Sequence, residues 1–541
     1  MSTDVIVRAL AQAEYFASQG TFQLATQEQP EVHYLVSAAP VPTALAILAL
    51  SIPGISAPSA VDKGAKYLEM TQLADDGWGN IPEGPSNVLA TAICSKGLQA
   101  SMDCVNFKEL IYDAAYLIAK TWTQDFNRLA PDWLPKQNSP VFKLVEAISG
   151  KPLIPTLDSL TLKDLSIISH YMPPYGRPTI LAVTLIKFHY RYGHTEEVKV
   201  AAKDLVAQIS ENGSWCDDIV VTSLAMLALY LAEVYEPLQH AAQWLCSTQY
   251  PHGGWPSFNQ LSNWAVGWAG YLLGPLNQSL RRSCSSYLQR ALNSDSSLGT
   301  APPNSYPDLD DTSIGLLALA ADPEVPRSVL SPIKELLLKL QNRDGSWSTF
   351  PSFAALPPKC TCKFPVYIKS EDITVHVLLA LLTSGMSKDS PQISKAVNWL
   401  IKRQKPDGTW NSTWFLGQTY ATAQVIDLLL YLEPQCEAVT KGLTSLINAQ
   451  TADGAWDTGS AGECGLAIYA LLRAGVQPDN EVITRGLRYL LSLQQADGSF
   501  RPFYSGFYAS GLYYEEPLSE AMAAARALRF YLHLINSTNQ K

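Results

Sequence analysis

Three carboxylates stand at the start of one apolar segment, where Asp308, Asp310 and Asp311 lie in the run Tyr-Pro-Asp-Leu-Asp-Asp-Thr. One acidic residue there would serve as a helix cap, because carboxylates stabilise the N-terminus of a helix. Three exceed what capping needs, and their mutual repulsion should keep at least one of them protonated near neutral pH. A protonated carboxyl that faces a dry cavity is a general acid. The run therefore indicates either a capping cluster or a proton donor.

A second pair of titratable residues, Asp372 and His376, lies in the run Ser-Glu-Asp-Ile-Thr-Val-His. Their i, i+4 spacing places both side chains on one face of a helix. A single histidine in an apolar helix is usually a core residue with satisfied hydrogen bonds. Spacing alone leaves that interpretation open beside a functional one.

A recurring segment predicts the elements that hold these residues: an apolar helix, a glutamine, a short polar stretch and then Gly-x-aromatic. The copies end at Trp78, Trp215, Trp255, Trp347, Trp410, Trp456 and Phe500. Asp-Gly or Asn-Gly supplies a turn, and apolar residues recur at helical spacing on both sides of it. Stacked helical hairpins close into α/α barrels. Copies before and after residue 250 therefore predict an all-α chain of two barrels, although such repeats also occur in proteins that are not enzymes.

Composition narrows the class of protein. Of 541 residues, 47% are hydrophobic and 16% charged, which favours folded domains with large cores over disorder. The net charge of -10 argues against a nucleic-acid partner. We find no signal-peptide pattern and no apolar run of transmembrane length. The nine cysteines are scattered, and Cys360 and Cys362 have no histidine nearby that would complete a zinc site. A cytoplasmic protein without a metal site is expected.

The glutamine–tryptophan repeats and the Asp-x-Asp-Asp-Thr run resemble those of squalene–hopene cyclases and related class II terpene cyclases, over roughly residues 60–530. These enzymes protonate an alkene of a linear isoprenoid and steer the carbocation into fused rings. The resemblance implies two α/α barrels, with the first inserted into the second. We accordingly expect residues 1–25 to form a helix on the C-terminal barrel, 26–235 to form the inserted barrel, and 236–541 to form the catalytic barrel.

The resemblance also assigns roles to the acidic residues. It implies that Asp310 donates the proton and that Asp308 and Asp311 tune it. The run that ends at His376 is similar to a family segment whose histidine hydrogen-bonds the donor and whose aspartate, here Asp372, supports that histidine. Protonating an alkene needs a strong acid, which clustering weakens, so hydrogen bonds and the positive helix end must restore acidity. No cofactor is implied for this step.

Aromatic side chains are expected to line the cavity, because their π-faces stabilise a cation without trapping it and water must be excluded. Alignment with cavity positions of hopene cyclases implies these: Tyr175, Trp264, Phe350, Trp414, Phe507 and Tyr513.

The sequence differs from those of hopene cyclases in ways that indicate a different substrate. The chain is shorter, Lys363 replaces an acidic residue, Arg177 lies in another matched segment, and the region around the expected membrane-docking surface is more polar. These features favour a C20 prenyl diphosphate such as geranylgeranyl diphosphate, cyclised to a bicyclic diphosphate, with weak or absent membrane association. A diphosphate substrate would also introduce Mg²⁺ as a binding aid. Squalene–hopene-type cyclisation and cyclisation of a prenylated meroterpenoid remain alternatives.

Three rival functions have weaker support. A class I terpene synthase needs Asp-Asp-x-x-Asp, and Asp217-Asp218 lacks the third acid. A protein prenyltransferase β-subunit needs a zinc site, whereas Cys464 has no evident ligand partner and only His533 follows it. A non-catalytic barrel protein would not need the acid cluster. The sequence leaves open the ring number, the stereochemistry, the fate of the final cation and the oligomeric state.

Overall fold

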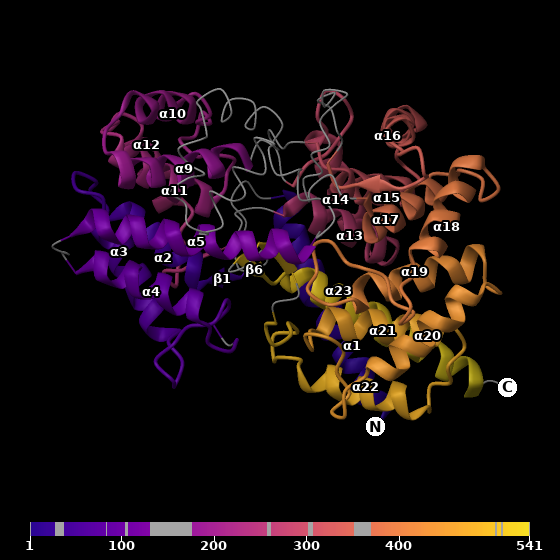
Figure 1. Cartoon of the computed structure of the whole chain (residues 1–541). Helices are drawn as coiled ribbons and strands as arrows, with labels where there is room; N and C mark the ends of the chain where they lie inside the picture. The colour runs from indigo at the N-terminus through magenta and orange to yellow at the C-terminus, as the bar shows by residue number, and fades with distance from the viewer. Residues whose placement is uncertain are drawn as a thin grey trace.

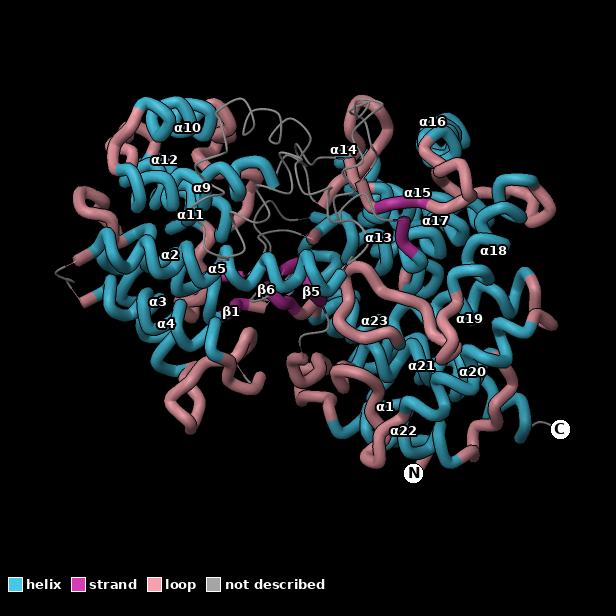
Figure 2. The backbone as a smooth tube through the Cα atoms, in the orientation of Figure 1, coloured by secondary structure: helices cyan, strands magenta, loops and turns pink. Residues whose placement is uncertain are grey.

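In the computed structural model the helices form two bodies that lie side by side (Figure 1). The structure describes residues 2–26, 37–82, 84–102, 106–129, 176–256, 261–300, 307–350, 369–503, 506–509 and 512–539. Helices make up nearly all of the regular structure in these ranges, and the strands are short (Figure 2). The predicted all-α architecture of α/α barrels is therefore confirmed.

The second body is a barrel with an inner and an outer layer of helices. The inner helices are α13 (Ser262–Leu272), α15 (Leu309–Ala321), α17 (Glu371–Thr383), α19 (Thr419–Leu432), α21 (Ala461–Arg473) and α23 (Pro517–Asn539). Each of them contacts the next, and α23 contacts α13, so the inner layer is a closed ring. The helices α14 (Gln278–Ala291), α16 (Arg327–Lys339), α18 (Pro391–Arg403), α20 (Glu437–Ala449) and α22 (Glu481–Ser492) lie outside it.

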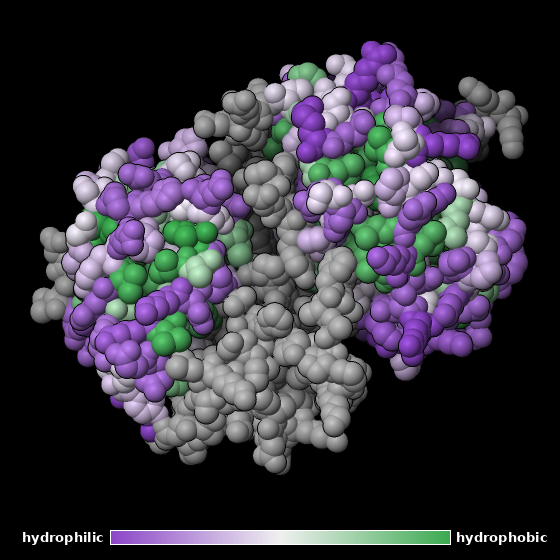
Figure 3. Space-filling view, turned by 90° about the horizontal axis from the view of Figure 1, so that it is seen from above, coloured by the Kyte–Doolittle hydropathy of each residue, from purple (hydrophilic) through white to green (hydrophobic). Residues whose placement is uncertain are grey.

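The apolar pattern of each helix explains its layer. Helix α15 is buried all round from Leu309 to Leu319, as expected for a helix with neighbours on every side. Helix α18 instead buries one stripe that includes Ile393, Val397 and Leu400, at the spacing of an amphipathic helix. Its other face meets solvent. In the view from above, hydrophilic side chains accordingly dominate the visible outer rims of both bodies, with apolar patches between them (Figure 3).

Helix α1 (Thr3–Thr26) belongs to the second body although it opens the chain. It packs against α23, α14 and α13, and its buried stripe from Ile6 to Leu24 joins the core of that barrel. Gln494, which follows α22, donates its side-chain amide to the carbonyl of Ala9, 2.9 Å away. Helix α1 thus completes the outer layer after α22.

The glutamines and tryptophans of the repeat tie each turn to the helices beside it. Each tryptophan donates its indole N–H to the carbonyl ten residues earlier, at 2.7–2.8 Å: Trp78 to Leu68, Trp215 to Leu205, Trp255 to Leu245, Trp347 to Leu337, Trp410 to Leu400 and Trp456 to Leu446. Gln404 links its own turn at Gly408 to Ala438 of the next outer helix. Gln450 likewise links its own turn at Gly454 to Val482 of the next outer helix. These glutamines and tryptophans are therefore committed to the scaffold.

The first body has its own apolar core. Its described helices α2 (Pro40–Leu50), α4 (Val88–Ser101), α5 (Phe107–Leu129), α9 (Gly176–Tyr192) and α11 (Ile219–Leu231) contact one another in sequence, and α11 returns to α2. Helices α3 (Pro58–Met70), α10 (Glu196–Val206) and α12 (Leu238–Ser247) flank them.

Strand pairs mark where the chain passes between elements. Strand β1 (Ala38–Ala39) pairs with β2 (Trp255–Pro256), so the chain enters and leaves the first body at one place. The core of this body extends to Trp255, beyond the boundary that the sequence suggested after residue 235, because α12 and its tryptophan form one more repeat. In the second body, β3 (Trp347–Ser348) pairs with β4 (Lys369–Ser370), and β5 (Gly506–Ala509) with β6 (Leu512–Tyr514). Among the described residues, no helix is long and apolar enough to cross a membrane.

Candidate active site

Asp308 is the N-cap of α15 and sets the geometry of the acid cluster. Its backbone is extended, and its N–H donates to the carbonyl of Leu298 at 2.8 Å. Its carboxylate accepts hydrogen bonds from the backbone N–H of Asp310 at 2.7 Å and of Asp311 at 3.4 Å. The capping interpretation is thus correct for one of the three acids. Capping leaves the side chains of the other two free for other contacts.

Asp310 lies against His376 on the neighbouring inner helix α17. The Oδ1 atom of Asp310 is 2.5 Å from Nδ1 of His376, and the imidazole is fully buried. The contact joins residues 66 positions apart, and it forms because α15 and α17 are adjacent in the inner ring. The structure therefore brings together the expected donor and the expected histidine.

Asp372, which the resemblance implies supports His376, directs its hydrogen bonds to other residues. Its carboxylate accepts hydrogen bonds from the backbone N–H of Thr413 at 2.7 Å, from that of Ile373 at 3.0 Å and from the hydroxyl of Ser370. It is one helical turn before His376, but its hydrogen bonds tie the start of α17 to the loop before α19. Its contribution at the imidazole is that of a nearby negative charge.

The second nitrogen of His376 is instead paired with residues of α19. Its Nε2 lies 3.0 Å from Oε1 of Gln424 and 3.4 Å from the hydroxyl of Tyr420. The sequence analysis named neither residue. The available signal was their spacing, since Tyr420 and Gln424 stand at i and i+4 in a mostly apolar helix and share one face.

Burial controls the charge of this cluster. It raises the pKa of Asp308 and Asp311 well above the usual value, and the negative charges of neighbouring carboxylates raise them further. It also raises the pKa of Asp310, although His376 opposes that shift. Burial disfavours the imidazolium, yet the Asp310 carboxylate outweighs it, so the pKa of His376 is raised overall. Near neutral pH the cluster is expected to hold several exchangeable protons.

The raised pKa of Asp311 makes the stability of the fold depend on pH. Asp311 is buried, and its Oδ1 has no hydrogen-bond partner among the described residues. Its pKa is higher in the folded state than in the unfolded state, so its contribution to stability falls as pH rises through the folded-state pKa. Asp311→Asn removes that titration. We expect this variant to be more stable by about 1–2 kcal/mol at pH 8 and nearly unchanged below pH about 4, by thermal denaturation at several pH values.

Asp407→Asn is the matched control for that measurement. Asp407 lies in an exposed repeat turn, where the Thr409 hydroxyl lowers the pKa of its carboxyl. The Asp407 carboxylate stabilises the folded state at pH values above its pKa in the unfolded chain, and this stabilisation is lost as the pH falls. Its effect on stability therefore has the opposite sign to that of Asp311. The control should therefore show no gain at high pH. A gain equal to that of Asp311→Asn would contradict the assigned cause.

Aromatic rings enclose the histidine. The rings of Trp264 and Trp268 on α13 lie edge-on to the imidazole, with centroids 5.5 and 5.6 Å away. Tyr420 lies at 6.0 Å, and Phe415 stacks on Tyr420 at 3.5 Å. Trp264, Trp268, Phe415 and Tyr420, with Gln424, border a cavity of about 60 Å³ inside the barrel. The expected cavity residue Trp264 is therefore at the centre of the site.

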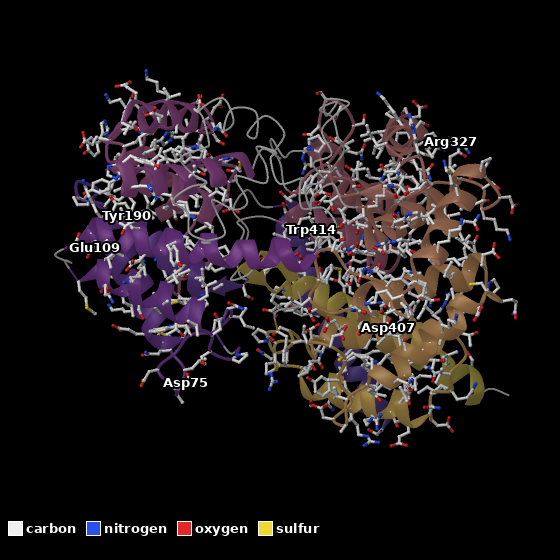
Figure 4. The ribbon with its side chains drawn as sticks, in the orientation of Figure 1. Asp75, Glu109, Tyr190, Arg327, Asp407 and Trp414 are labelled. Atoms are coloured by element: carbon white, nitrogen blue, oxygen red, sulfur yellow. The ribbon has the colours of Figure 1, made fainter. Side chains whose placement is uncertain are left out.

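Two other expected aromatic residues lie together at the edge of the barrel. Phe350 and Trp414 pack with ring centroids 6.3 Å apart, and the indole N–H of Trp414 donates to the Thr349 hydroxyl at 3.0 Å. In Figure 4, Trp414 lies on the side of the second body that is nearer to the first. The backbone of Leu309, beside the acid cluster, donates to the Thr349 carbonyl at 2.7 Å, which places this pair near the cluster.

The remaining expected site residues are not placed by the structure. Tyr175 and Lys363 lie outside the described residues. Arg177 belongs to α9, and Phe507 pairs with Tyr513 between β5 and β6, but the side chains of these three residues also lie outside the described part. Their expected contacts with substrate therefore stay predictions.

Glu516, just before α23, is a further acid that the sequence analysis did not name. Burial raises its pKa to about 7, and its charge acts on both Asp310 and Asp311. The indole N–H of Trp264 lies near it without forming a hydrogen bond of normal geometry. Among the described residues, no group of three or more His, Cys, Asp or Glu side chains is arranged to hold a metal ion.

Comparison with known proteins finds similar terpene cyclases. Residues 302–513 match the squalene-hopene cyclase C-terminal domain. The chain is 30% identical over 133 residues to the squalene–hopene cyclase of Alicyclobacillus acidocaldarius, covering 23% of this chain and 21% of that protein. It is 24% identical over 280 residues to the drimenyl diphosphate synthase of Streptomyces showdoensis, covering 49% of each. The fold is similar to that of ent-copalyl diphosphate synthase from Streptomyces platensis, with a TM-score of 0.54, 18% identity and coverage of 97% and 99%.

These matches show that the chain is similar to class II terpene cyclases, most extensively within residues 302–513. The matched domain contains the acid cluster, His376 and Gln424. The matched stretches span less than half the length of each of the two curated relatives. The structural likeness, at 18% identity, concerns the fold alone.

Proposed function

We propose that the protein is a class II terpene cyclase in which Asp310 protonates an alkene of a linear isoprenoid. The observation that carries this proposal is the buried contact between Asp310 and His376, beside two further carboxyls whose pKa is raised. The proton moves from Asp310 to one alkene carbon, and the π electrons form the new C–H bond. The cation left on the other carbon is attacked by the next double bond. Repetition of that attack closes the rings.

The surroundings of Asp310 supply what this step needs. A hydrogen bond from the Nδ1–H of His376 stabilises the aspartate as its proton leaves. The backbone N–H groups at the start of α15 favour negative charge there. Trp264, Trp268 and Tyr420 present aromatic surface, which stabilises a cation without capturing it. The terminal cation then loses a proton or takes up water.

The substrate proposed is a C20 prenyl diphosphate such as geranylgeranyl diphosphate, converted to a bicyclic diphosphate. The similarity to drimenyl diphosphate synthase over about half of each chain supports the diphosphate head group. The C20 chain length is supported by 27% identity over 175 residues to the ent-copalyl diphosphate synthase of a Streptomyces species. Because the proposed chemistry begins at an alkene, the diphosphate stays on the product. Mg²⁺ would then assist binding of the head group and take no part in proton transfer. A squalene–hopene-type activity is the second candidate, favoured by the domain match over residues 302–513.

Incubation of the purified protein with geranylgeranyl diphosphate and, separately, with squalene tests the proposal. With the diphosphate we expect a cyclic product that still carries its diphosphate, detected by mass spectrometry before and after phosphatase treatment. Low concentrations of Mg²⁺ should lower KM with little change in kcat. Hopene-like hydrocarbons from squalene, with no product from the diphosphate, would select the second candidate. Release of inorganic diphosphate from the substrate would contradict both.

A further inference from the structure

We propose that Gln424 is a positioning residue that keeps both ring nitrogens of His376 protonated, so that His376 donates to Asp310 and the acidic proton of Asp310 faces the substrate. This inference rests on the proposed function and assigns a role to a residue that the acid motif does not contain. The protonation of the two His376 ring nitrogens can be measured without substrate.

The carboxamide oxygen of Gln424 determines whether the second ring nitrogen of His376 carries a hydrogen. Oε1 of Gln424 lies 3.0 Å from Nε2 of His376, and both side chains are buried. A carboxamide oxygen accepts hydrogen bonds and cannot donate them. Nε2 must therefore carry a hydrogen. The neutral imidazole with hydrogen on Nδ1 alone is disfavoured, because its bare Nε2 would face the oxygen.

This requirement decides the chemistry at the other nitrogen. A neutral imidazole with hydrogen on Nε2 has a bare Nδ1, which would hold the proton of Asp310 on Oδ1, 2.5 Å away. An imidazolium instead donates Nδ1–H to Oδ1. The proton of Asp310 then lies on Oδ2, and the departing carboxylate receives a charge-assisted hydrogen bond. Gln424 favours the second arrangement, because hydrogen bonds to an ion are stronger than those to a neutral group.

The other groups around His376 do not replace Gln424. Asp310 on α15 and Asp372 on α17 favour the imidazolium through their negative charge, and burial opposes it. Trp264 and Trp268 on α13 carry no charge. The Tyr420 hydroxyl on α19 lies 3.4 Å from Nε2, farther than Gln424. Among the described residues, the carboxamide is therefore the close acceptor at that nitrogen.

Two substitutions separate the hydrogen bond from the packing. Gln424→Met keeps the length of the side chain and removes the accepting oxygen. Gln424→Glu keeps an oxygen at the same reach. We expect the first to lower the proton affinity of His376 about tenfold, a fall of about one unit in its titration midpoint. The second should restore the midpoint to at least the wild-type value.

Nitrogen NMR of protein labelled at its eight histidines measures this directly. The His376 signals are assigned as those missing from a His376→Ala sample. In the wild type at neutral pH, both ring nitrogens should show protonated shifts. In parallel, the alkaline limb of the kcat profile should move down by about one pH unit in Gln424→Met, with KM unchanged.

The outcomes separate this inference from the proposed function. A wild-type His376 with a bare Nε2 at neutral pH would overturn the inference, whether or not Gln424→Met folds. An unchanged His376 titration in folded Gln424→Met would do the same. If the wild type turned over neither isoprenoid, the proposed function would fail while the NMR result still decided the role of Gln424.

Discussion

Replacement of Asp310 by asparagine is expected to lower turnover on the order of 10⁴-fold. Asparagine has the shape of aspartate and still offers an oxygen to His376, but it has no proton to give an alkene. KM should change little, because the side chain acts in the transition state. Single-turnover product formation, measured by mass spectrometry, tests this. Circular dichroism should show an unchanged helical spectrum.

Asp218→Asn provides a matched control for that substitution. Asp218 caps α11 in the first body as Asp308 caps α15, is buried, and has a pKa raised to about 7 by burial. The same chemical change there should leave turnover near the wild-type value. Near-normal turnover by Asp310→Asn would show that the initiating proton comes from another group.

Removal of the imidazole in His376→Ala should be the next most damaging change. We expect turnover to fall about 10²- to 10³-fold, since general acid catalysis of this kind contributes 10²- to 10⁴-fold in total and Asp310 itself remains. The aspartate then loses the donor that stabilises its charged form. The loss of a buried hydrogen-bonding partner should cost about 1–3 kcal/mol of stability. Turnover and thermal denaturation are measured on the same sample.

His189→Ala is the control that separates the loss of turnover from the loss of stability. His189 is also a buried histidine, and its Nδ1 lies 2.8 Å from the Tyr112 hydroxyl in the first body. This variant should lose a comparable amount of stability and keep its turnover. An equal loss of turnover in both variants would mean that His376 acts only through the fold.

The sequence predicted the parts of this molecule that depend on local chemistry. The position of Asp308 at the start of a helix followed from capping preferences, and the barrel followed from the spacing of Gln404, Trp410 and their counterparts. The capping carboxylate of Asp308 finds its partners within three residues. A repeat tryptophan finds its partner ten residues earlier, and a repeat glutamine binds its own turn and the next repeat. Such contacts are fixed by sequence separation alone.

The contacts that define the site were harder to predict because they join neighbouring helices of the inner ring that are far apart in the sequence. Which residue pairs with Nε2 of His376 depends on the rotation of α19 against α17, and that rotation is set by packing of the whole inner ring. The family resemblance implied that Asp372 supports His376, without saying at which ring nitrogen. The structure places Gln424 beside Nε2, 48 positions away from His376, and commits Asp372 to Thr413.

The position of α1 sets the order in which the catalytic body is completed. Because α1 fills the outer layer after α22, the contact between Ala9 and Gln494, 485 positions apart, cannot form until both segments have been made. At roughly 5–20 residues per second that interval is on the order of a minute. The first body has a separate core and can fold during that interval. Closure of the second barrel must await α22 and α23, because α23 completes the inner ring that holds the acid site.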